Sequence, residues 1–143
     1  MLKRLGLIVG IVLVGCFTAA AGTYSIPQEQ IKGQKVYWGK AHAFDKPGGI
    51  RYDDVLRATP EYQELKGKKV ERGTGKYWIL LSQASDRAVR AISRVGQESK
   101  YDFIAEHDYL TSVKPAIPAE DITPLVIQAI HGKTTKKAQH RKR

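Results

Sequence analysis

The sequence predicts an α+β protein of one domain, and three observations support this prediction. Short segments rich in β-branched and aromatic residues alternate with longer segments of helical periodicity. The 143 residues suffice for one domain, and the 42% of hydrophobic residues suffice to fill its core. With the single cysteine Cys16, the chain can form neither an internal disulfide framework nor a cysteine-based zinc cluster.

The first residues are typical of an export signal. Lys3 and Arg4 precede residues 5–15, which are apolar throughout and too few to span a bilayer as a helix. We therefore expect a secretory signal over residues 1–21. The protein would be exported, with residues 22–34 as an N-terminal tether.

Two cleavage patterns compete within this signal. Residues 19–21 are three alanines before Gly22, as ordinary signal peptidase requires. Residues 13–16 are similar to a bacterial lipobox, in which Cys16 is the lipidated residue and the signal ends at residue 15. Both interpretations stay open. We favour the second, because the only cysteine lies at the required position, and it would anchor the protein to the outer membrane by lipid.

Positive charge is concentrated at the C-terminus. The whole chain carries +10, whereas residues 5–132 hold 16 basic and 14 acidic residues. Residues 133–143 contain no acid and predict a disordered basic tail, which contacts anionic lipid, acidic client chains or no specific partner. Export makes nucleic acid an unexpected partner. The basic residues of this tail are Lys133, Lys136, Lys137, Arg141, Lys142 and Arg143.

Residues 35–132 form the predicted domain. Residues 35–38 suit a short strand, because they combine β-branched and aromatic side chains. Residues 45–49 contain Pro47 and two glycines, which is typical of a turn or loop.

One or two short helices are predicted over residues 52–65. Pro60 suits the first position of the second helix, and Thr59 suits its N-cap. Residues 67–75 are basic and contain glycines, so we expect a connector there.

The clearest helix is predicted over residues 76–97. Apolar residues recur there at spacings of three and four, with Ile92 widening the stripe. Two interpretations stay open: an ordinary amphipathic core helix, which is the commoner cause of this spacing, and a coiled-coil seam for self-association. The residues of this stripe, called the seam below, are Tyr77, Leu81, Ala84, Ala88, Ala91 and Val95.

The last part of the domain predicts two strands and a helix. We expect residues 101–105 to form a strand and residues 109–113 to form its partner across a turn at residues 107–108. Pro115 and Pro118 mark a loop. A helix should then begin at Thr123 and Pro124 and end at Gly132. We expect it to bury a face made of Ile122, Leu125, Val126 and Ile130.

No constellation of residues predicts a catalytic, cofactor or metal site, so the expected protein is not an enzyme. Residues 73–76, Gly-Thr-Gly-Lys, are similar to part of a phosphate loop, but Val70 stands where glycine is needed and Tyr77 stands where serine or threonine is needed. The carboxylate pairs at residues 53–54 and 120–121 are adjacent in sequence, which suits helix-end charges and caps better than a shared proton. His107 beside Asp108 is interpreted as a surface pair.

Three stretches of the second half follow one another in a recognisable order. They are residues 87–95 (RAVRAISRV), residues 101–104 (YDFI) and residues 121–127 (DITPLVI). They resemble the end of the OmpH/Skp family of periplasmic chaperones, in which an arm helix enters a YDxV-like strand, a second strand follows, and a helix begun by DIT ends the body. Residues 55–56 and 59–62 are more weakly similar to the first helix of that family.

The resemblance implies a homotrimer that binds unfolded or outer-membrane proteins between helical arms. Only residues 65–77 are available for such an arm, so no deep client cavity is expected. Exposed aromatic residues would provide broad contacts, namely Tyr37, Trp38, Tyr77 and Trp78. The alternative function is a structural or assembly lipoprotein that docks on one envelope partner while its basic tail contacts anionic lipid. A small exported hydrolase is the third hypothesis, which loss of activity on a single Ser, His or Asp change would support.

Overall fold

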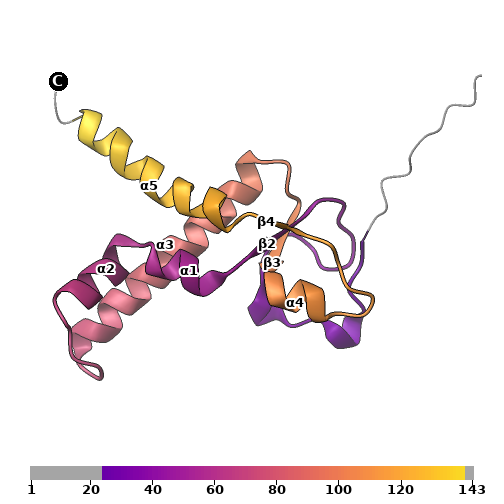
Figure 1. The fold of residues 1–143 in the computed structure, drawn as a ribbon, viewed down its shortest axis with the longest axis horizontal. Helices are drawn as coiled ribbons and strands as arrows, with labels where there is room; N and C mark the ends of the chain where they lie inside the picture. The colour runs from indigo at the N-terminus through magenta and orange to yellow at the C-terminus, as the bar shows by residue number, and fades with distance from the viewer. Residues whose placement is uncertain (1–23, 141–143) are drawn as a thin grey trace, which may run out of the picture.

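The computed structural model describes the backbone of residues 24–140 and the side chains of residues 24–132. Its centre is a four-stranded sheet of order β1-β3-β2-β4 (Figure 1). The strands are β1 (Val36–Trp38), β2 (Pro47–Ile50), β3 (Phe103–Glu106) and β4 (Glu120–Asp121). β2 runs parallel to both β3 and β4, whereas β1 is antiparallel to β3. Mixed helix and strand confirm the predicted α+β class.

Strand β3 separates two hydrophobic clusters, because successive residues of a strand point to opposite faces of the sheet. Ile104 belongs to a cluster with Ile50, Val55, Ile92 and other residues of the helices. Phe103 and Ala105 belong to the second cluster, on the opposite face. The core is therefore divided into two layers by one short strand.

Four helices contribute to the first cluster or extend from it. They are α1 (Tyr52–Arg57), α2 (Pro60–Gly67), α3 (Gly75–Glu98) and α5 (Thr123–His140). α3 is 24 residues long, and α5 packs across it (Figure 1). α2 folds back along the first half of α3, and this helical hairpin extends away from the sheet.

The predicted helix starts are confirmed by their caps. The hydroxyl of Thr59 accepts a hydrogen bond from the backbone N–H of Tyr62, and Pro60 takes the first position of α2. The hydroxyl of Thr74 likewise accepts from the N–H of Tyr77 at the start of α3. The Gly-Thr-Gly sequence before α3 thus lies in the expected connector, and its threonine also provides a cap that the sequence analysis did not identify.

The turn or loop predicted at residues 45–49 is wrong over most of its length, because strand β2 begins at Pro47. β2 lies in the interior of the sheet and is buried at all four residues. A Cβ on Gly48 would lie 2.5 Å from a methyl carbon of Ile122, and one on Gly49 would lie 2.6 Å from Nδ1 of His107. Glycine is needed at both positions because neighbouring side chains approach this backbone closely. In the sequence alone, glycines of this kind look the same as the glycines of a turn.

The strand predicted at residues 109–113 is also wrong. These residues lie in or just after helix α4 (His107–Ser112), which starts directly after β3. β3 already pairs with β1 on one side and β2 on the other, so it offers no edge to a third strand. Tyr109, Leu110 and Val113 instead pack into the second cluster.

The N-terminal tether predicted over residues 22–34 is folded from Tyr24 onward. Tyr24 and Phe44 exchange backbone hydrogen bonds, and Ile26 is buried in the second cluster. Two short 3-10 helices, η1 (Gln28–Gln30) and η2 (Gly33–Lys35), continue to β1. The hydroxyl of Tyr109 donates to the carbonyl of Gln30, which fixes this segment against α4.

Helix α5 departs from its prediction in two ways. It continues past Gly132 to His140, so residues 133–140 of the predicted disordered tail have helical backbone. Leu125, expected on the buried face with Ile122, Val126 and Ile130, is 39% exposed. Val126 and Ile130 are one helical turn apart and define the face of α5 that packs on α3. Leu125 lies beside that face.

No helix within the part of the chain that the structure describes is both long and apolar enough to cross a bilayer.

Candidate functional site

Among the side chains of residues 24–132, the two most exposed large hydrophobic ones are adjacent at the start of α3. Trp78 is 58% exposed and Ile79 is 59% exposed. They lie where α2 and α3 are joined, at the end of the hairpin that extends furthest from the sheet. We call residues 66–79 the hairpin tip. Neighbouring exposed apolar side chains on a projecting element are typical of an interaction site.

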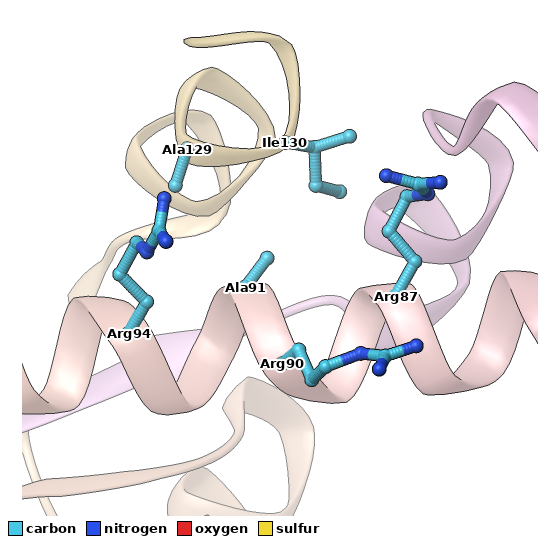
Figure 2. A pocket seen from close by; sticks show the side chains of 6 residues that line it. All are labelled: Arg87, Arg90, Ala91, Arg94, Ala129 and Ile130. Carbon is cyan, nitrogen blue, oxygen red and sulfur yellow. The ribbon is translucent and has the colours of Figure 1, made fainter. Parts of the chain in front are cut away.

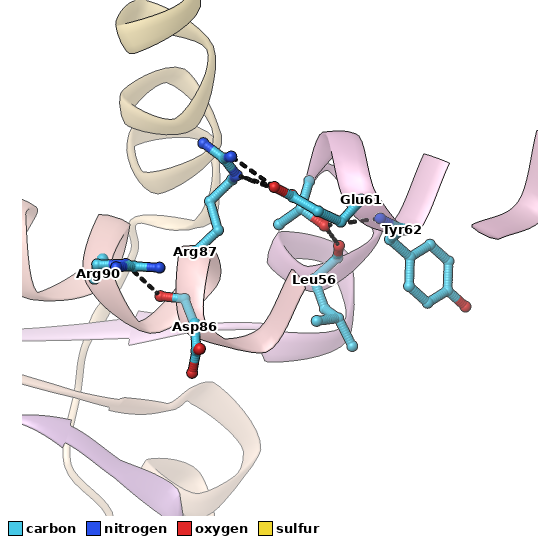
Figure 3. A network of polar contacts seen from close by, with 7 residues as sticks. Leu56, Glu61, Tyr62, Asp86, Arg87 and Arg90 are labelled. Atoms are coloured by element: carbon cyan, nitrogen blue, oxygen red, sulfur yellow. Dashed lines mark hydrogen bonds and ion pairs between the residues drawn. The ribbon is translucent and has the colours of Figure 1, made fainter. Parts of the chain in front are cut away.

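A bidentate ion pair holds the two helices of the hairpin together (Figure 3). Nε of Arg87 on α3 donates to both carboxylate oxygens of Glu61 on α2, at 2.9 and 2.8 Å, and Nη2 donates to Oε1 at 2.5 Å. Leu65 of α2 and Leu80 of α3 are buried. The pair therefore fixes α2 along α3, in a fork geometry that only arginine offers.

The Glu61–Arg87 pair shifts the pKa of both partners toward their charged forms. The hydrogen bonds from Arg87 hold the pKa of the Glu61 carboxyl below its ordinary value, against a smaller opposing effect of burial. The same hydrogen bonds raise the pKa of Arg87. Both groups are charged at neutral pH, and the hairpin is stabilised by their attraction.

The hairpin tip is strongly basic as well as apolar. It contains five basic residues and one acidic residue. Among the basic residues, Lys68 pairs with Glu64 at 2.8 Å. Beside the tip lies a shallow pocket of about 310 Å³, lined by Tyr62, Leu65 and Tyr77 together with Lys66, Lys69 and Arg72. This combination suits broad contacts with apolar and acidic segments of another chain.

The seam predicted on α3 divides into two parts. Ala84, Ala88, Ala91 and Val95 are buried within this chain, and the last three contact residues of α1, α5 and the sheet. The remaining two, Tyr77 and Leu81, are partly exposed near the tip. The core interpretation thus accounts for the four buried residues. Self-association through α3 would have to use its other faces.

The four aromatic residues expected to be exposed differ in their surroundings. Tyr37 stacks on Tyr52 with ring centroids 5.2 Å apart, and both Tyr37 and Trp38 pack against the first cluster. Tyr77 is partly exposed and meets Trp78 edge to face at 5.3 Å. Of the four, only Trp78 is an exposed side chain.

The lipidation candidate Cys16 and the predicted signal lie outside the residues that the structure describes. Arg141, Lys142 and Arg143 of the basic tail do so as well. Lys133, Lys136 and Lys137 lie on the helical backbone of α5, in the half that extends away from the body (Figure 1).

The carboxylate pairs have structural roles. Asp53 and Asp54 stand in the first turn of α1, and Asp121 accepts a hydrogen bond from the backbone N–H of Thr123. A hydrogen bond with the side chain of Thr123 is the main reason why the pKa of Asp121 is lowered, and the backbone contact lowers it further. The hydroxyl of Tyr101 donates to Glu120 at 2.6 Å, which raises the pKa of Tyr101 to about 12. These contacts fix β4 and the start of α5.

His107 is not in the turn that the sequence suggested but at the start of α4. Its Nδ1 is buried and makes no hydrogen bond to any group that the structure describes. Within the described part of the chain, no three His, Cys, Asp or Glu residues gather as a metal site would require.

The sequence analysis missed Ile79, which completes the exposed pair with Trp78. The signal was present, because Trp78 and Ile79 fall between the apolar positions of the α3 stripe. Comparisons with family models, curated proteins and solved structures give no match to this chain.

Proposed function

We propose that this chain is a non-enzymatic envelope protein of the OmpH/Skp kind, which binds unfolded or outer-membrane proteins in the periplasm. The observation that carries the proposal is the hairpin tip. It offers Trp78 and Ile79, more than half exposed, within a basic surface and at a distance from the sheet. Such a surface favours contacts with the apolar and acidic segments that a non-native chain exposes.

The order of elements supports the same proposal. The resemblance calls for a long helix that enters a strand, then a second strand and a closing helix. α3, β3, β4 and α5 follow in this order, with α4 inserted between the strands. The three similar stretches fall in α3, at β3 and at the junction of β4 with α5.

The length of the hairpin limits how clients are held. α2 has eight residues and α3 has 24, which correspond to about 12 and about 36 Å of helix. Roughly half of α3 is committed to the core. We therefore propose that clients are held on the surface of short arms in a homotrimer, without being enclosed in a deep cavity.

Client capture by tip variants tests this proposal. The expected result is that the protein delays aggregation of several urea-denatured outer-membrane proteins, and that the double variant Trp78→Ser, Ile79→Ser loses this effect. Val89→Ser is the matched control, because Val89 is a 40% exposed apolar residue of α3 outside the tip. Equal activity of the tip variant and the control would contradict the proposal.

Light scattering over a range of concentrations tests the trimer. A solution mass near three times that of the monomer supports the chaperone-like assembly. A clean monomer would contradict it and would favour the alternative function.

The alternative is a structural or assembly lipoprotein, and the C-terminal segment favours it. Six basic residues follow Gly132, and α5 carries the first three away from the body. In that case the body docks on one envelope partner, Cys16 carries the lipid, and the basic residues contact anionic headgroups. Capture of one folded partner, without capture of several unfolded clients, would support the alternative.

A further inference from the structure

A groove between α3 and α5 is separate from the hairpin tip (Figure 2). Its volume is about 290 Å³, and it is lined by Arg87, Arg90, Ala91 and Arg94 of α3 and by Ala129 and Ile130 of α5. Arg94 rises from α3 toward α5, Arg87 extends toward Glu61 of α2 on the other side of Ala91, and Arg90 lies along α3. The groove therefore has an apolar floor and cationic walls.

The arginines of the groove exceed the carboxylates that neutralise them. Arg87 is paired with both oxygens of Glu61. Nε of Arg90 donates to the backbone carbonyl of Asp86, which is a neutral acceptor (Figure 3). Nε of Arg94 lies 3.7 Å from Oε1 of Glu98, whose side chain is 70% exposed. Arg90 and Arg94 thus retain most of their capacity to bind an anion.

The apolar floor limits what the anion can be attached to. Ala91 and Ile130 are almost fully buried by the contact of the two helices, and Ala129 is partly exposed above them. A ligand that fits has an anionic group for the arginines and an apolar group for the floor, within a volume of one or two residues. The last residue of a protein chain has both, namely its α-carboxylate and an apolar side chain.

We propose that this groove binds the C-terminal carboxylate of a client chain that ends in an apolar residue. This inference rests on the proposed function and adds a feature that the protein recognises in its clients. An acidic residue within a client chain fits less well, because the chain would have to leave the groove on both sides of that residue. Residues 133–143 of this chain are also unsuitable occupants, because they carry six basic side chains and no acidic one.

A peptide pair provides the test. The probe is a fluorescein-labelled peptide of five glycines that ends in phenylalanine with a free carboxylate, and its partner is the same peptide with an amidated end. Fluorescence anisotropy is measured on the full chain with Cys16→Ser, which removes any lipid. We expect the affinity for the free acid to fall as the salt concentration rises. The affinity for the amide should be at least about tenfold lower, which corresponds to a loss of about 1.4 kcal/mol of binding free energy.

Substitutions assign the binding to the groove. The double variant Arg90→Gln, Arg94→Gln should weaken binding of the free acid at least about tenfold. Arg57→Gln is the matched control, because Arg57 is exposed on α1 outside the groove. Arg94→Lys keeps the charge but loses the planar fork, and should give an intermediate affinity.

Three results would overturn the inference. They are equal binding of acid and amide, unchanged binding in the double variant, and direct binding of phosphatidylglycerol vesicles that depends on Arg90 and Arg94 while the peptide itself does not bind. The last result would assign the groove to lipid phosphate.

Failure of this inference is distinguishable from failure of the proposed function. The groove variant should retain capture of unfolded clients that lack an apolar C-terminus. The variant of Trp78 and Ile79 should lose client capture but retain peptide binding.

Discussion

The two halves of α3 have different surroundings. From Ala84 to Val95 the helix buries five side chains, four of them in the first cluster with α1, α5 and the sheet, whereas in residues 75–83 only Leu80 is buried. The first half of α3 lies along α2 and leaves Trp78 and Ile79 exposed. One continuous helix thus serves as core at one end and as an exposed surface at the other. Substitutions in the second half should affect stability, and those in the first half should affect binding.

The largest effect is expected from Ala88→Glu. Ala88 is fully buried in the first cluster, so the variant places an unpaired carboxylate in the core. We expect the free energy of unfolding to fall by about 3–5 kcal/mol, measured by urea denaturation. Val89→Glu at the exposed neighbouring position should change it by no more than about 0.5 kcal/mol. A stable Ala88→Glu protein that converts discretely to monomers would instead support the self-association seam.

A smaller loss is expected from Gly96→Ala near the end of α3. A Cβ at this position would lie 2.5 Å from ring carbons of Trp38, so the indole would have to move. The expected cost is about 1–3 kcal/mol in thermal or urea unfolding, although alanine is the better helix former. Gly75→Ala is the control at the other end of the helix, where a Cβ would meet no atom within 4 Å. A stabilised Gly96→Ala protein would show that Trp38 does not pack on α3 in solution.

Glu61→Gln should destabilise the hairpin by about 1 kcal/mol at neutral pH, because it breaks a partly exposed bidentate pair. The pH dependence gives a sharper result. The folded-state pKa of Glu61 lies below its ordinary value. The contribution of the pair is therefore complete above that ordinary value and is lost as the pH falls through the lowered pKa.

The comparison of variants isolates this titration. Above the ordinary carboxyl pKa, the difference in free energy of unfolding between the wild-type protein and Glu61→Gln should be constant. As the pH falls further, the wild-type protein should lose this extra stability. Glu98→Gln is the control, because Glu98 is 70% exposed and lies 3.7 Å from Arg94. A difference between wild type and Glu61→Gln that grows toward low pH would contradict the role of the pair.

The smallest effect on stability is expected from the tip. The variant Trp78→Ser, Ile79→Ser removes side chains that are more than half exposed, so the free energy of unfolding should change by no more than about 0.5 kcal/mol. Thermal unfolding measures this. A large loss of stability would mean that these side chains are covered in solution, as in an oligomer interface.

The success of the sequence analysis depended on how local each signal was. The cap at Thr59 and the periodic α3 were predicted because their causes lie within a few residues of chain. Strand β2 was missed, because its glycines reflect contacts with Ile122 and His107, more than 50 residues away. The strand predicted at residues 109–113 failed because β1 and β2 already occupy both edges of β3.

The sequence by itself determined the α+β class and the starts of α2, α3 and α5, since these follow from apolar spacing and from the residues that begin a helix. Only the tertiary structure decided which apolar residues of α3 are core and which are exposed, because Ala88 and Trp78 belong to one helix whose two halves meet different neighbours. It also decided that Arg90 and Arg94 line a groove, because α5 forms the other wall. Neighbours distant in sequence determine burial, and burial determines which side chains another molecule can contact.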